Sequence, residues 1–238
     1  YNLELETMNK SKYLLILLMI VFTVPTIYSS QAQKTIRIRG GVWADWEDTK
    51  GRLWYSGHRT DQEWGGYVGL RPQITKANPA NGEVLSKKSQ QLVKDAGYDL
   101  EMMGQGAYSG REPDEVKNGI QYKVNTGNGK FDVTLIIAEY GENDRHFGLK
   151  IEGKVVAKKF KSPLVNEAII ETFKNIRVSG DSMEIHLTTL VGVPRPRPIF
   201  MGLDIYPAGK DPRLIDGDVD VQIQNKLTTT WGRIKNNN

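Results

Sequence analysis

One stretch constrains the fold of this chain more than any other: GKFDVTLIIAEYGENDRHFGLKIEG, residues 129–153. Apolar residues alternate from Phe131 to Ile137, as they do along one face of a β-strand. Ile136 and Ala138 make the opposite face apolar as well. Because a strand that is apolar on both faces is normally covered on both, we expect this one in the interior of a sheet.

The same strand ends on Glu139 and Tyr140, which are followed by a polar loop that contains glycine. The alternation then resumes at Phe147, Leu149 and Ile151. A tyrosine at the junction of a rigid strand and a loop is held in place without being buried. Its flat ring and its hydroxyl suit a ligand with both apolar and polar parts. From the residues alone, packing at the end of the sheet and contact with a ligand both remain open for this tyrosine.

The N-terminal region has the three parts of a secretory signal. Met8 begins the stretch MNKSKYLLILLMIVFTVPTIYSSQAQ, in which two lysines precede an apolar run from Tyr13 to Val24. Small residues follow at Ser30-Gln31-Ala32, and the run is short for a membrane span. We predict upstream translated residues at 1–7 and a signal peptide at 8–32. The alternative is a buried helix of a soluble domain.

The predicted mature chain, from residue 33, is expected to be secreted or periplasmic. The chain has no cysteine, so its core and not disulfides must stabilise it. The lack of cysteine also excludes a lipid anchor at the cleavage site, a cysteine–zinc site and a thiol nucleophile. The formal charge is only +4 and the basic residues are scattered, so we predict no nucleic-acid partner. The mature sequence has no second long apolar segment, so we predict no membrane span in it.

Period-two alternation predicts further strands at 35–39, 120–124, 155–160, 168–178, 183–190 and 199–205. Asn128-Gly129 predicts a hairpin between the strand at 120–124 and the buried strand. Gly153-Lys154 predicts a second hairpin. Short strands with glycine-rich turns and few helices indicate an all-β fold, either a sandwich or a barrel.

Three segments depart from this pattern. Residues 86–96 are compatible with one short helix. Residues 42–75 carry several tryptophans and tyrosines but alternate poorly, so we predict a long aromatic-rich loop near the N-terminus. Long loops in compact domains often carry function. Residues 209–238 are predicted to form a polar C-terminal tail.

Several short motifs follow one another in order: Gly40-Gly41, Gly65-Gly66-Tyr67, Tyr108 in a glycine-rich loop, Ala138-Glu139, and Pro198-Ile-Phe-Met-Gly202-Leu-Asp-Ile205. In this order and spacing the chain resembles malectin and the malectin-like carbohydrate-binding modules over residues 35–207. The resemblance implies a jelly-roll-type β-sandwich at residues 33–208 that binds a saccharide at one loop-built end without catalysis. Bacterial members of this group are often exported or joined to glycoside-degrading enzymes.

The resemblance also implies where a sugar would be held. Tyr67 and Tyr108 match two tyrosines on separate loops, and Tyr140 matches the first of an aromatic pair. Gly141 stands at the second aromatic position, so part of the platform is missing.

The family's aspartate position falls in a stretch, residues 192–198, that has no acid and offers Arg195 or Arg197 instead. Because an arginine fork matches a carboxylate, this difference favours an acidic sugar over malectin's glucose disaccharide.

Each of these residues has a structural alternative. Glu139 is an acceptor that commonly orders a turn through backbone N–H groups. The three tyrosines could pack at the end of the sandwich. Trp64 either extends the sugar platform or packs the aromatic segment onto the sheet, since large aromatic residues usually serve burial first.

Catalysis and metal binding find less support in the sequence. Asp45, Glu47 and Asp48 are close together, but a glycosidase needs two carboxylates at a set separation across the bond. The three histidines are far apart in sequence and lack a partner pattern for base catalysis. The acidic run 216–220 lacks the glycine and the distal acid of an EF-hand loop, so we predict no metal.

We therefore predict an exported, non-catalytic, lectin-like protein without a cofactor. Its predicted ligand-binding residues are Tyr67, Tyr108, Tyr140, Glu139, Arg195, Arg197 and Trp64. The predicted partner is an oligosaccharide or polysaccharide. A glycan-degrading enzyme or a surface partner would accompany it, since weak sugar sites gain affinity from repetition or fusion. The alternatives are a β-sandwich hydrolase or lyase, and a structural or adhesive surface module that binds protein.

Overall fold

The computed structural model describes residues 33–109, 119–141, 144–193 and 195–213. The strands are β1 (Ile36–Arg39), β2 (Trp46–Glu47), β3 (Leu53–Ser56), β4 (Gly65–Tyr67), β5 (Gln73–Lys76), β6 (Gln105–Tyr108), β7 (Ile120–Val124), β8 (Gly129–Glu139), β9 (His146–Ile151), β10 (Lys154–Lys161), β11 (Glu167–Val178), β12 (Met183–Thr189), β13 (Ile199–Phe200) and β14 (Gly202–Pro207). The helical segments are η1 (Pro79–Asn81), α2 (Lys87–Asp95) and η2 (Leu100–Gly104). The predicted signal peptide and the tail beyond residue 213 lie outside the described residues.

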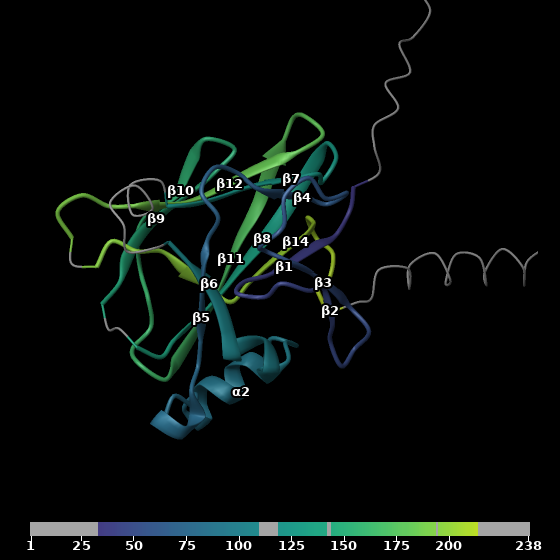
Figure 1. Cartoon of the computed structure of the whole chain (residues 1–238). Helices are drawn as coiled ribbons and strands as arrows, with labels where there is room; N and C mark the ends of the chain where they lie inside the picture. Colours follow the sequence, from purple (N-terminus) through teal and green to yellow (C-terminus); the bar gives the residue numbers. More distant parts are fainter. Residues whose placement is uncertain (1–32, 110–118, 142–143, 194, 214–238) are drawn as a thin grey trace, which may run out of the picture. The chain divides into compact units, whose positions relative to one another are not determined.

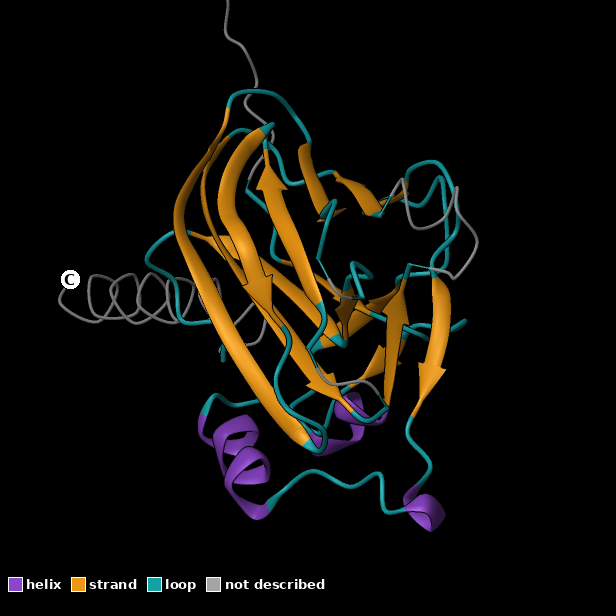
Figure 2. Ribbon diagram, turned by 90° about the vertical axis from the view of Figure 1, so that its left-hand side faces the viewer, coloured by secondary structure: helices purple, strands orange, loops and turns teal. Residues whose placement is uncertain are grey.

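The strands form two large sheets and a small one (Figures 1 and 2). The first has the order β11-β8-β14-β1-β3-β2, the second β10-β9-β12-β7-β4, and the small sheet β13-β6-β5. The predicted all-β sandwich is confirmed. Strand β8 pairs with β11 on one side and β14 on the other, so the doubly apolar strand is an interior strand, as its sequence predicts.

The core lies between the two large sheets because each contributes one apolar face. The first sheet contributes alternate residues of β8, such as Val133 and Leu135, and the second contributes Tyr122 and Leu149, all buried. The other face of β8 is also covered. A Cβ atom on Gly202 would lie between 3.0 and 3.3 Å from Trp54, Met102 and Ile136, so these side chains meet there.

The connections between strands differ in part from the sequence prediction. The hairpin across Gly153-Lys154 is confirmed, since β9 and β10 pair in antiparallel fashion. The hairpin predicted across Asn128-Gly129 is wrong. Strand β7 belongs to the second sheet and β8 to the first, so this turn carries the chain from one sheet to the other. The predicted strand 199–205 is also divided, because β13 joins the small sheet and β14 the first sheet.

Residues 42–75 are not one long loop. This segment contains β2 and β3, which pair with each other, and β4 and β5, which pair with β7 and β6. Each strand is only two to four residues long, so the period-two pattern is too brief to be recognised in the sequence.

The helix predicted at residues 86–96 is confirmed as α2. The Ser86 side chain caps it by accepting a hydrogen bond from Ser89 N at 3.1 Å. Both serine hydroxyls also donate to Glu167 on β11, which fastens the helix to the edge of the first sheet. No helix among the described residues has the length and apolar character to cross a membrane.

Asp48, one of the acids weighed as a catalytic alternative, has structural contacts instead. Asp48 is buried and accepts hydrogen bonds from Arg52 Nε at 2.6 Å and Trp54 Nε1 at 3.1 Å. Arg52 also donates to the carbonyl oxygens of Gly97, at 2.8 Å, and Pro212, at 3.0 Å. This buried ion pair therefore joins the β2–β3 turn to the end of α2 and to the start of the predicted tail.

Candidate functional site

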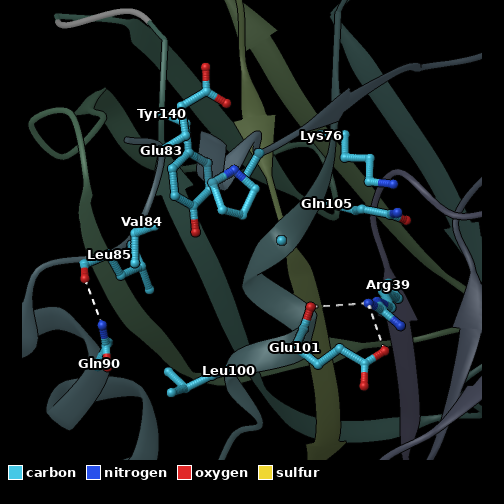
Figure 3. A pocket seen from close by; sticks show the side chains of 13 residues that line it. Arg39, Lys76, Glu83, Val84, Leu85, Gln90, Leu100, Glu101, Gln105 and Tyr140 are labelled. Atoms are coloured by element: carbon cyan, nitrogen blue, oxygen red, sulfur yellow. Dashed lines mark hydrogen bonds and ion pairs between the residues drawn. The ribbon is translucent and has the colours of Figure 1, made fainter. Parts of the chain in front are cut away.

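A pocket of about 480 Å³ opens beside Tyr140, the residue that follows β8 (Figure 3). Its lining residues come from the ends of β1, β5 and β8, the start of β6, the segment 77–85, α2 and η2. They are Arg39, Lys76, Ala77, Pro79, Glu83, Val84, Leu85, Gln90, Leu100, Glu101, Gly104, Gln105 and Tyr140. Four separate stretches of the chain, at residues 39, 76–90, 100–105 and 140, thus meet at one hollow.

The backbone at Tyr140 is fixed by the residue before it. Glu139 is 1% exposed, and its Oε1 accepts hydrogen bonds from Tyr140 N at 3.2 Å and Gly141 N at 3.1 Å. Its Oε2 lies 2.7 Å from Arg145 Nε in a buried ion pair. Glu139 therefore orders the turn and holds the aromatic side chain at the pocket, which is the structural role weighed for it from the sequence.

The wall next to Tyr140 is tied to the same strand end. Asn166 N donates to the Glu139 carbonyl at 2.7 Å, and its Nδ2 donates to Gly82 O at 3.0 Å. Ser86 N donates to Asn166 O at 2.7 Å. Through Asn166, the segment that carries residues 83–85 is held against β8.

This wall is mainly apolar. Figure 3 shows the Tyr140 ring beside Glu83, with Val84 and Leu85 next to them. Leu85 is buried, whereas half of Val84 is exposed. Burial, followed by the nearby charge of Glu83, raises the pKa of Tyr140 to about 12. The hydroxyl therefore stays protonated at ordinary pH and can donate a hydrogen bond.

The opposite wall is polar and is anchored by Arg39. Its Nη2 donates to the Glu101 carbonyl at 3.1 Å and lies 3.7 Å from Glu101 Oε1. Its guanidinium carbon lies 4.2 Å from the centre of the Trp46 ring. Burial lowers the pKa of Arg39 and the charge of Glu101 opposes this, but an arginine remains charged in either case.

Lys76 and Gln105 complete the polar wall. Figure 3 shows their side chains side by side above Arg39. Neither side chain makes a hydrogen bond or ion pair within the part of the chain that the structure describes. Together with the Tyr140 hydroxyl, these two side chains give the pocket free donors and acceptors around an apolar surface, whereas the Gln90 amide donates to Leu85 O at 2.8 Å.

Tyr67 and Tyr108 lie outside this pocket. Tyr67 is partly buried on β4, opposite Tyr122 of β7. Tyr108 is partly buried on β6 and its hydroxyl donates to Gln73 Oε1 at 2.7 Å. Their expected part in ligand binding stays a prediction.

Arg195 and Arg197 lie in the loop before β13 and also line no part of the pocket. Arg195 is exposed, and its carbonyl accepts from Arg197 N at 2.8 Å. Their predicted contact with a ligand is likewise untested.

Trp64 is placed differently from its predicted role. It is 4% exposed and stacks on Tyr55 with ring centres 5.8 Å apart. In this conformation it offers no face to a sugar, and the structure favours the packing alternative.

The sequence reasoning missed most of the pocket. Arg39 ends a strand with alternating Ile and Arg, a pattern that gives no sign of which arginine turns toward a ligand. Gln105 and Lys76 stand on short strands that were not predicted. The described residues contain no cluster of histidine and acidic side chains that could hold a metal ion.

No protein-family model matches the chain, and no curated protein matches it. Solved structures do. The extracellular domain of ANXUR1 from Arabidopsis thaliana is 13% identical, with a TM-score of 0.59 over 76% of this chain and 49% of that one. The extracellular domain of ANXUR2 from the same plant is 16% identical, with a TM-score of 0.58 over 76% and 50%.

A beta-glucuronidase from Bacteroides uniformis is 12% identical, with a TM-score of 0.51 over 73% of this chain and 18% of that one. The chain thus spans about half the length of the plant domains and less than a fifth of the enzyme. At these identities the likeness concerns the fold alone. The plant ectodomains are malectin-like, so this chain has a malectin-like fold.

Proposed function

We propose that this chain is an exported, non-catalytic module of the malectin-like group that binds a saccharide in the Tyr140 pocket. One observation carries the proposal: a fixed tyrosine ring and an apolar wall face free polar side chains across a single hollow. A sugar ring has an apolar C–H face and a rim of hydroxyls. Aromatic rings match the face, and donors such as the Tyr140 hydroxyl match the rim.

The size and position of the pocket support this proposal. A volume of about 480 Å³ is within the range of small-molecule sites. The malectin-like fold and its occurrence in extracellular domains support export and a role in recognition. Tyr67, Tyr108, Arg195 and Arg197 would contribute only to a ligand that extends beyond the pocket.

The pocket holds two carboxylates, Glu83 and Glu101, and a glycosidase would need such a pair. Both have structural contacts here. Glu83 accepts a hydrogen bond from the backbone of Asn78, and Glu101 faces Arg39. We therefore propose binding and not hydrolysis, and the experiment below includes a direct measurement of cleavage.

A glycan array probed with the protein, with Tyr140→Ala and with Tyr140→Phe tests the proposal. We expect saccharide hits that Tyr140→Ala abolishes. Tyr140→Phe should keep the stacking surface and weaken binding about 10-fold, since it removes one hydrogen bond to the ligand. Tyr108→Ala, which removes a partly buried tyrosine outside the pocket, is the matched control.

The other outcomes separate the alternatives. A silent array from a folded protein would refute saccharide binding and favour a protein-binding surface module. Hits lost only in Tyr108→Ala would refute the Tyr140 pocket and favour the loop-built site predicted from the sequence. New reducing ends released from a bound polysaccharide would identify a hydrolase, and unsaturated ends a lyase.

A further inference from the structure

We infer that the Tyr140 pocket selects a saccharide that carries a carboxylate and holds this group between Arg39 and Lys76. The inference rests on the proposed function, because it names the ligand class of the same pocket. It differs from the sequence expectation of an acidic sugar, which depended on Arg195 and Arg197. Neither of those residues lines the pocket.

Arg39 is a fixed cation. Its side chain is only 7% exposed, because the Trp46 ring covers the guanidinium and the Glu101 carbonyl accepts from Nη2. Its Nε is buried and has no hydrogen-bond partner among the described residues, so a ligand carboxylate would meet the terminal nitrogens of the guanidinium. A planar guanidinium that is already immobilised loses little entropy when it binds a planar carboxylate.

Lys76 supplies a second, mobile cation on the same wall. It ends β5, is exposed, and its ammonium group has no partner among the residues that the structure describes. Figure 3 shows it on the same side of the pocket as Arg39. An anion placed there would meet one cation that is held in position and one that can move to it.

Two acidic side chains, Glu83 and Glu101, affect the orientation in which a charged saccharide would bind in the pocket. Glu83 lies beside Tyr140 on the opposite wall, where it would repel a ligand carboxylate. Glu101 lies 3.7 Å from Arg39 and offsets part of its charge, but its side chain is 70% exposed, so water screens that effect. The sugar's apolar face should therefore rest on Val84, Leu85 and Tyr140, with its carboxylate toward Arg39 and Lys76.

The test uses trisaccharides of galacturonate, glucuronate and mannuronate, each beside its own methyl ester, and titration calorimetry. Acid and ester share the ring, linkage and hydroxyls and differ in charge. We expect at least one acid to bind about 10-fold more tightly than its ester at about 20 mM salt. The difference should shrink at about 500 mM salt because the cations are partly exposed.

The variants separate the charge from the fold. Lys76→Gln should reduce affinity for the acid about 3-fold or more and leave the ester unchanged. Lys158→Gln, at an exposed position on β10 of the second large sheet, makes the same change in net charge and should have no effect. Arg39→Lys keeps the positive charge but replaces the planar guanidinium with an ammonium group. The folding of this variant is checked by circular dichroism before its binding is measured.

Equal affinity for acid and ester, or an acid affinity that Lys76→Gln leaves unchanged, would overturn the inference. If a sulfated galactotriose bound more tightly than every uronate, the polar wall would be a site for sulfate esters. The inference that the ligand carries a carboxylate would then be wrong. Failure to bind any uronate would also overturn it. In that case, neutral hits that depend on Tyr140 would leave the proposed function intact, whereas a silent array would refute both.

Discussion

Removal of the Asp48 carboxylate is expected to destabilise the whole domain. Asp48 accepts four hydrogen bonds, from Lys50 N, from both the backbone and Nε of Arg52, and from Trp54 Nε1. Its partner Arg52 has a fully buried side chain. In Asp48→Ala the guanidinium would keep only its two backbone carbonyl acceptors, on Gly97 and Pro212, and no counter-charge.

The loss of one member of a buried, hydrogen-bonded pair costs about 3–5 kcal/mol, because the remaining charge is left uncompensated. For a domain of this size, each kcal/mol lowers the melting temperature by roughly 2–4 °C. We therefore expect Asp48→Ala to melt about 6–20 °C below the parent protein. The double variant Asp48→Ala/Arg52→Met should lose less unfolding free energy than the two single variants lose in total, since it removes both charges.

Urea and thermal unfolding, followed by circular dichroism, measure these free energies.

The pH dependence of the unfolding free energy gives a second test. Burial raises the pKa of Asp48, but the bonds from Arg52 and Trp54 outweigh this and leave it below 3.8. The stabilisation is therefore complete above that value and is lost as the pH falls through the lower, folded-state pKa. A loss under about 1 kcal/mol in Asp48→Ala, or additive losses in the double variant, would refute the reasoning.

Two further predictions concern the supports of the pocket. In Gly40→Ala the new Cβ would lie 2.6 and 2.7 Å from backbone atoms of β13 and β6, so we expect a loss of about 1–3 kcal/mol in urea unfolding. Gly180 has open space around it, so Gly180→Ala should lose less than about 1 kcal/mol. Equal losses in the Gly40 and Gly180 variants would contradict the predicted clash at Gly40. Ser86→Ala removes the cap of α2 and should cost about 1 kcal/mol. Unchanged stability there would mean that packing of α2 on β11, and not its cap, fixes the helix.

The sequence predicts well those elements whose signal is local and long. Strand β8 is buried from Phe131 to Glu139, as its long apolar run predicts, and it is placed correctly in the interior of a sheet. Helix α2 was expected from residues 86–96, and Ser86 and Ala96 are its caps. In both cases the segment carries its own periodicity or its own end signals.

Pairing between segments was less predictable. The Asn128-Gly129 turn is a good hairpin signal, but the flanking strands each found better partners in different sheets. Trp64 lies next to two glycines and has the sequence of a loop residue, yet contacts with Tyr55 and Tyr122 bury it. Such outcomes depend on which surfaces meet, and that information is not local.

The pocket shows the same limit at the level of function. Tyr140 was identified because it interrupts a strong pattern, and it does line a hollow. Arg39 and Lys76 interrupt nothing, since charged residues are common at the ends of short strands. They line one pocket only because β1 and β5 end at the same place, which is a property of the tertiary structure.

The pairing of β1 with β14 has a consequence for the time course of folding. The first described strand receives its antiparallel partner from the last one, with Ile36 opposite Ile205. A chain emerging from the ribosome therefore cannot complete the first sheet until Gly202–Pro207 has been synthesised. Folds governed by such distant pairings form slowly, in milliseconds to seconds. This delay would keep the chain unfolded for longer, which is the state that a secretory pathway must receive if the protein is exported.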